Sequence, residues 1–121
     1  MLIDDEPIML AIIGEELRNK GYEVETYGSA YKCVASHHGK CPCSNCPDVI
    51  LTDFEMPQMN GVEYLNLLNR RKCPCRHIAL MTGDTLDDAR FHKIKKRGVK
   101  LFRKPFSITD IIGWVSLIQK T

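Results

Sequence analysis

The feature that most constrains the fold of this chain is an alternation of short apolar runs with longer segments of helical periodicity. The short runs, each a candidate β-strand, occupy residues 2–3, 22–27, 49–52, 77–81 and 99–103. Helical patterns occupy residues 7–20, 61–71, 85–97 and 107–120, with a shorter pattern at 29–36. A strand followed by a helix, repeated five times, predicts a doubly wound α/β domain with a parallel sheet.

The helical segments carry recognisable end signals. Pro7 lies at the expected first turn of its helix, and Gly21 follows the last turn. Gly98 follows the charged segment 85–97, and Ser107 is a candidate cap for the last helix. These signals support the helix boundaries that the periodicity predicts.

Length and composition favour one globular domain over residues 1–121. Hydrophobic residues make up 44% of the 121 residues, and the net charge of +2 gives no argument for nucleic-acid binding. The start "MLIDDEP" is too acidic for a signal peptide, and no apolar run approaches the roughly 20 residues of a membrane helix. We therefore expect a cytoplasmic protein with reduced thiols. The first strand is shorter than the usual five or so residues, so a few natural N-terminal residues are expected to be missing.

Polar residues follow the apolar runs at the point where each predicted strand ends. The first run ends in Asp4 and Asp5, the third in Asp53, the fourth in Thr82 and the fifth in Lys104. Ligands of open parallel α/β sheets bind beyond the carboxyl ends of the strands. These five side chains are therefore expected to share one edge of the sheet.

Three clustered carboxylates call for a hard cation or raised pKa values, and Mg²⁺ suits oxygen ligands of this kind. A Mg²⁺ ion and a lysine beside a spare carboxylate form a site for a phosphoryl group, with the carboxylate as the attacking nucleophile. The simpler interpretation is that Asp4 and Asp5 cap a helix and that Lys104 is a surface residue. Because that interpretation requires four coincidences at strand ends, we favour the phosphoryl site.

Four segments of the chain, "LIDDEP", "VILTDFEMPQMNG", "IALMTGD" and "LFRKPF", resemble the signatures of bacterial response-regulator receiver domains in order and spacing. The resemblance covers essentially the whole chain. It implies a flavodoxin-like, five-stranded parallel sheet in the order 2-1-3-4-5, with helices on both faces.

The resemblance also implies roles for individual residues. Asp53 would be the phospho-acceptor, with Thr82 contacting the phosphoryl group and Lys104 pairing with it. Asp4, Asp5 and Asp53 would hold Mg²⁺ together with the backbone carbonyl of Glu55. A cis peptide would fall at Lys104–Pro105. Pro57 and Gly61 match the family's turn after the acceptor strand.

The chain departs from the family pattern in places. The switch position three residues before the lysine is usually Tyr or Phe, and here it is Leu101, with Phe102 next to it. Glu55 and Asp84 occupy positions that modulate the lifetime of the phosphoryl group in the family. An aspartyl phosphatase is a weak rival, because Asp53-Phe54-Glu55 lacks its second aspartate and the chain is too short for a cap. A flavin-binding module is also weak, because acidic residues after the first strand would repel a phosphate.

Cysteines cluster in the segments that enter the third and fourth strands. Cys46 and Asp53 lie on the order of 20 Å apart in an extended strand, so the cysteines and the acidic edge are separate sites. The two strands are neighbours in the receiver fold, so the cysteines are candidate ligands of one Zn²⁺ or iron–sulfur site, near His37, His38 and His77. Unliganded thiols or a disulfide are together the more frequent outcome for such spacing. Cys33 is expected to be a small core residue. The candidate ligands are Cys41, Cys43, Cys46, Cys73 and Cys75.

The segment 90–104 carries eight basic residues, which favours a solvated helix face over a docking patch for an acidic partner. Trp114 is interpreted as either exposed to a partner or buried.

The sequence thus predicts a non-enzymatic receiver domain. It would take a phosphoryl group from a sensor histidine kinase or phosphotransfer protein, assist its own phosphotransfer and dephosphorylation, and act on a downstream effector, without binding membrane or nucleic acid itself. The alternative hypothesis is a degenerate receiver that acts as a thiol- or metal-dependent binding module.

Overall fold

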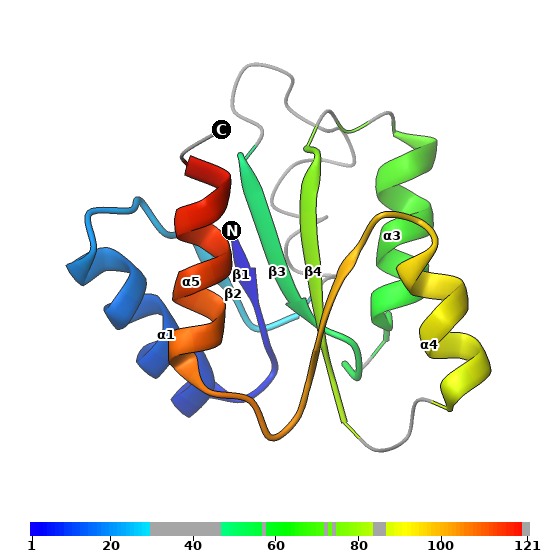
Figure 1. The fold of residues 1–121 in the computed structure, drawn as a ribbon, viewed down its shortest axis with the longest axis horizontal. Coiled ribbons are helices and arrows are strands. Elements are labelled where there is room, and N and C mark those ends of the chain that lie inside the picture. Colours follow the sequence, from blue (N-terminus) through cyan, green and yellow to red (C-terminus); the bar gives the residue numbers. More distant parts are fainter. Residues whose placement is uncertain (30–46, 57, 72, 74, 84–86, 120–121) are drawn as a thin grey trace.

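A computed structural model of the chain describes residues 1–29, 47–56, 58–71, 73, 75–83 and 87–119. Within them, five parallel strands form one sheet in the order β2-β1-β3-β4-β5, which confirms the predicted fold class (Figure 1). The strands are β1 (Leu2–Ile3), β2 (Thr26–Tyr27), β3 (Val49–Asp53), β4 (His77–Thr82) and β5 (Lys100–Arg103). The shorter helical pattern at 29–36 falls almost entirely outside the described residues.

Helices cover both faces of the sheet. Helices α1 (Pro7–Asn19) and α5 (Ile108–Gln119) lie on one face, and α3 (Gly61–Arg70) and α4 (Asp88–Lys95) lie on the other (Figure 1). Ile13 of α1 and Ile111 of α5 pack with Leu2, Leu51 and other buried side chains in the core beneath the first pair. Separate clusters on the opposite face contain Tyr64 and Leu65 of α3 and Ile94 of α4. No helix of the described residues is both long enough and apolar enough to span a membrane.

The predicted end signals of the first and last helices are present in the structure, and a further cap precedes α3. Pro7 occupies the first turn of α1, and Gly21 follows the helix with a φ of 94°. Asn60 caps α3 through a reciprocal capping box with Glu63. The Ser107 hydroxyl accepts a hydrogen bond from the Asp110 N–H at 3.2 Å, as expected of a cap.

Strand β2 is shorter than the predicted strand at 22–27. Its partner β1 pairs only Leu2 with Thr26 and Ile3 with Tyr27, so the ladder of β2 ends where β1 ends. Val24 remains half-buried against the core, which explains its place in the apolar pattern. Helix α4 is likewise shorter than the predicted helix at 85–97, because Asp87 caps it through the Arg90 N–H and the helix begins at Asp88.

Candidate phosphoryl-acceptor site

The carboxyl ends of β1, β3, β4 and β5 lie at one edge of the sheet and bring four polar side chains together (Figure 1). Asp4 follows β1, Asp53 ends β3, Thr82 ends β4 and Lys104 follows β5. Asp4 and Thr82 are fully buried, and Asp53 is 4% exposed. Polar side chains at these positions have given up most of their contact with water, which is costly unless they are partnered.

The Lys104 side chain lies near carboxylates from two segments, the end of β3 and the start of α1. Its Nζ lies 3.4 Å from Asp53 Oδ1 and 4.0 Å from Glu6 Oε1. Its backbone N–H donates to the Thr82 carbonyl at 2.6 Å, and the peptide bond from Lys104 to Pro105 is cis, as the resemblance implies. The ammonium therefore lies between two carboxylates.

Two buried oxygen atoms at this edge have no hydrogen-bond partner among the described residues. They are Asp4 Oδ2 and Thr82 Oγ1. The other oxygen of Asp4, Oδ1, accepts the Glu6 N–H at 2.9 Å. Because buried polar atoms are normally satisfied, these two atoms indicate a site that completes its contacts with a ligand.

The electrostatics of the site follow from burial and crowding. Desolvation and the neighbouring Asp4 carboxylate raise the pKa of Asp53 to about 6, while the Lys104 ammonium opposes the shift. Desolvation likewise raises the pKa of Asp4, although the Glu6 N–H lowers it in part. A cation beside these carboxylates would favour their ionised forms.

Three acidic side chains that follow β1 lie close together. Carboxylate oxygens of Asp4, Asp5 and Glu6 lie within 4.8 Å of one another, and Asp5 and Glu6 are exposed. Glu6 was not among the predicted metal ligands. It is the extended N-cap residue of α1, and this turn brings its side chain back toward the strand ends. Its position directly after the two aspartates was the only signal in the sequence.

Other predicted residues lie around this edge. Glu55 is exposed just beyond β3, whereas Pro57 and Asp84 lie outside the described residues. Gly61 begins α3, and its N–H donates to the Phe54 carbonyl at 2.7 Å. Leu101, at the family's switch position, is half-buried in the cluster of Phe54 and Leu80.

The aromatic residue next to the switch position faces the other side of the sheet. Phe102 is buried, with its ring centroid 5.9 Å from that of the half-buried Trp114 in an edge-on arrangement. Trp114 thus packs against the core with part of its surface accessible.

The basic segment is mostly a solvated surface, apart from Lys104. Arg103 lies 3.9 Å from Asp88 and places its guanidinium 4.4 Å from the centroid of the Phe91 ring. Arg90 lies over the Phe54 ring. Such contacts cover apolar surface with the stems of the basic side chains.

The cysteines are described only in part. Cys73 and Cys75 are half-buried at the entry to β4, whereas Cys33, Cys41, Cys43, Cys46, His37 and His38 lie outside the described residues. The Cys75 Sγ lies 3.6 Å from the Asp48 carbonyl, so the segments that enter β3 and β4 do meet. Among the described residues, the acidic group at Asp4–Glu6 is the one potential metal cluster of three or more ligands.

Comparison with known proteins agrees with this geometry. Residues 1–116 match the response regulator receiver domain family. The chain is 27% identical over 112 residues to the probable transcriptional regulatory protein TcrX of Mycobacterium tuberculosis, covering 93% of this chain and 45% of that protein. It is 29% identical to protein-glutamate methylesterase/protein-glutamine glutaminase 2 of Vibrio vulnificus, covering 99% of this chain and 34% of that protein.

The chain thus spans less than half the length of these two relatives. Among solved structures, it resembles a response regulator receiver domain protein from Clostridium thermocellum, with a TM-score of 0.78 and 27% identity. That match covers 98% of this chain and 92% of the other. The family match, the strand order and the acidic edge agree, and the chain belongs to the response regulator receiver domain family.

Proposed function

We propose that this domain accepts a phosphoryl group on Asp53 from a sensor histidine kinase or phosphotransfer protein of a two-component or phosphorelay pathway. The observation that carries the proposal is the 3.4 Å contact of Lys104 Nζ with Asp53 Oδ1, beside two buried, unpartnered oxygens of Asp4 and Thr82. A carboxylate, an ammonium and a hydroxyl at one strand edge match the requirements of phosphoryl transfer.

The reaction forms a bond between an Asp53 carboxylate oxygen and phosphorus, while the bond from phosphorus to the donor nitrogen breaks. Lys104 would neutralise a phosphoryl oxygen once the Asp53 carboxylate has become an acyl phosphate and no longer carries its own charge. The Thr82 hydroxyl would donate a hydrogen bond to another phosphoryl oxygen, which gives Oγ1 a partner. Burial at this edge limits the access of water to the transferred group.

Oxygen donors at this edge fit Mg²⁺. Asp4 Oδ2 is buried without a protein partner, and Asp5 contributes an exposed carboxylate beside it. The proposed ligands are Asp4, Asp5, Asp53 and the Glu55 carbonyl. Bound there, Mg²⁺ would neutralise charge on the phosphoryl oxygens.

Phosphorylation is proposed to shift the domain between two conformations and so to change a surface that a downstream effector recognises. The position that is usually aromatic in the family is Leu101 in this chain. The proposed conformational change therefore relies on a movement of Thr82 toward the phosphoryl group. We further propose that the domain acts in the cytoplasm without enzymatic activity toward a separate substrate, and without binding membrane or nucleic acid itself.

The test is phosphorylation by a small phosphodonor such as acetyl phosphate, followed by intact mass spectrometry with Mg²⁺ or with chelator. The proposal expects one added phosphoryl group in the presence of Mg²⁺ and none in Asp53→Asn. Absence of the mass increase in the wild-type protein with Mg²⁺ would reject it.

A second candidate function, a thiol- or metal-dependent binding module, is favoured by one observation. Cys75 lies against Asp48, so a thiol of the β4 entry reaches the β3 entry segment, which follows the sequence "CPCSNCP". Elemental analysis beside a native thiol titration tests it. About one zinc or an iron–sulfur complement per chain with masked thiols would support the module, and metal-free protein with reactive thiols would reject it.

A further inference from the structure

The carboxylate of Glu6 has no role in the phosphoryl transfer described above, although it lies at the acidic edge. Glu6 is the extended N-cap residue of α1, yet its side chain makes no capping hydrogen bond. Its backbone N–H donates to Asp4 Oδ1 at 2.9 Å, which fixes the turn against the buried aspartate. The residue is therefore held by its backbone, while its exposed side chain is directed by other interactions.

The Glu6 carboxylate lies between two places for a positive charge. On one side, its Oε1 is 4.0 Å from the Lys104 ammonium nitrogen. On the other side, carboxylate oxygens of Asp4, Asp5 and Glu6 all lie within 4.8 Å of one another. Oxygen ligands in an octahedral Mg²⁺ shell lie about 3–4 Å apart, so this group is close to that spacing before any ion binds.

A separate observation indicates that the acidic group takes a ligand. Asp4 is fully buried, and its Oδ2 has no hydrogen-bond partner among the described residues. The Glu6 N–H already occupies the other oxygen of the same carboxylate. A buried carboxylate oxygen needs a donor or a cation, because it has lost its contact with water. The turn that carries Glu6 therefore borders an atom that calls for a cation.

Lys104 is shared between two carboxylates. Its Nζ lies 3.4 Å from Asp53 Oδ1 and 4.0 Å from Glu6 Oε1. Glu6 thus attracts the ammonium away from the acceptor. A divalent cation beside Asp4 would attract Glu6 more strongly than a single ammonium does, and it would also repel that ammonium. Occupation of the metal site and the pairing of Glu6 with Lys104 are therefore expected to compete.

We propose that Glu6 is a positioning residue that exchanges one cation for another. It pairs with Lys104 in the metal-free domain, and it turns to Mg²⁺ when Asp4 and Asp5 hold the ion. The exchange leaves the Lys104 ammonium to Asp53 alone, where the phosphoryl group is to be received. This inference rests on the proposed function, because it uses the Mg²⁺ site proposed beside Asp53.

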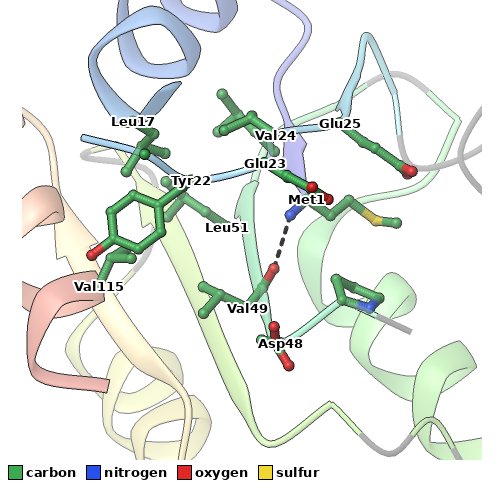
Figure 2. Close-up of a pocket in the computed structure, with 13 residues that line it drawn as sticks. Met1, Leu17, Tyr22, Glu23, Val24, Glu25, Asp48, Val49, Leu51 and Val115 are labelled. Atoms are coloured by element: carbon green, nitrogen blue, oxygen red, sulfur yellow. Dashed lines mark hydrogen bonds between the residues drawn. The ribbon is translucent and has the colours of Figure 1, made fainter. Parts of the chain in front are cut away.

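The first test measures Mg²⁺ affinity by isothermal titration calorimetry of the full chain, with Mg²⁺ alone and no phosphodonor. Glu6→Gln is expected to raise the Kd for Mg²⁺ about 3–10-fold, because it removes a charge next to the ion. The matched control is Glu23→Gln. Glu23 is also exposed, but it lines the cavity at the amino ends of the strands, on the opposite edge of the sheet (Figure 2). The control should leave the Kd within about twofold of the wild-type value.

A double-mutant cycle separates exchange from a merely structural role of Glu6. In Lys104→Met no ammonium competes for the glutamate, so Mg²⁺ should bind more tightly than in the wild type. Glu6→Gln should then raise the Kd by a factor at least about twice as large as it does in the wild-type background. A structural role would give the same factor in both backgrounds.

The outcomes distinguish this inference from the proposed function. An unchanged Kd in Glu6→Gln, or equal factors in the two Lys104 backgrounds, would overturn the exchange, while phosphorylation of Asp53 in the same proteins would still support the proposed function. Absence of Mg²⁺ binding by the wild-type chain would reject both the exchange and the proposed metal site.

Discussion

At the scale of single residues, the properties of the acidic edge depend on how far Asp53 is removed from water. Its carboxyl group is nearly buried, and the Asp4 carboxylate adds repulsion that Lys104 offsets only in part. The resulting pKa of about 6 means that the acceptor binds a proton more tightly in the folded chain than in the unfolded chain. Metal or phosphoryl binding would relieve this cost.

The raised pKa predicts a dependence of stability on pH. Between the unfolded value of 3.8 and the folded value of about 6, the folded state binds more protons at Asp53, so the stability contribution of this group falls as pH rises. Asp53→Asn removes the titration. The free energy of unfolding of the variant minus that of the wild type, measured in chelator, should therefore increase by about 1–3 kcal/mol between pH 4 and 6. Above pH 6 this difference should reach a plateau. Urea denaturation across this range measures it, and a constant difference would contradict the account.

Lys104 is predicted to act on the phosphoryl group and on the acceptor. Lys104→Met removes a charge-assisted contact of about 1.5–3 kcal/mol, so phosphoryl incorporation from acetyl phosphate should slow roughly 10–100-fold at saturating Mg²⁺. The pKa of Asp53 should also rise further, because the ammonium lowers it.

Lys100→Met is the matched control for this prediction. Lys100 is an exposed lysine of the same strand, and it lies over the Phe102 ring instead of facing Asp53. Equal rates for the two variants would show that Lys104 does not contribute through its position.

At the scale of elements, the turn from β3 into α3 fixes the acceptor strand against its neighbours. Gly61 begins α3 so close to the strand that a Cβ atom would lie 3.1 Å from both Phe54 Cα and Leu80 Cδ2. The capping box of Asn60 and Glu63 holds the same turn. The glycine in "MNG" is therefore required by close packing.

Gly61→Ala is predicted to destabilise the domain by about 1–3 kcal/mol, because the Phe54 backbone cannot move without shifting the strand next to Asp53. Gly113→Ala on α5 is the control. It has open space around the added atom and should stabilise the helix by about 0.5–1 kcal/mol. Thermal or denaturant unfolding measures both, and destabilisation of equal size in the two variants would contradict the packing argument.

Element boundaries show what the sequence could predict. The first-turn position of Pro7 and the cap at Ser107 depend on nearby residues, so local signals describe them well. The length of β2 depends on a strand far away in the sequence, because only Leu2 and Ile3 are available to pair with it. Periodicity alone therefore overestimated that strand.

At the scale of the whole molecule, the carboxyl ends of the strands carry the polar site, and the amino ends border a cavity. The carboxyl edge holds Asp4, Asp53, Thr82 and Lys104, and this grouping followed from the rule that parallel strands end together. The reach of Glu6 toward Lys104 and the cavity at the amino edge were not predicted. Both depend on where backbone segments meet in space, which a pattern of residue types does not record.

The most direct test of the central claim is to locate the phosphoryl group after treatment with acetyl phosphate and Mg²⁺. Proteolysis under mild conditions followed by peptide mass spectrometry separates the segment that contains Asp53 from those that contain Asp4, the histidines and the cysteines. The account predicts a single modified site at Asp53. Modification spread over histidines or thiols, or confined to any other residue, would contradict it.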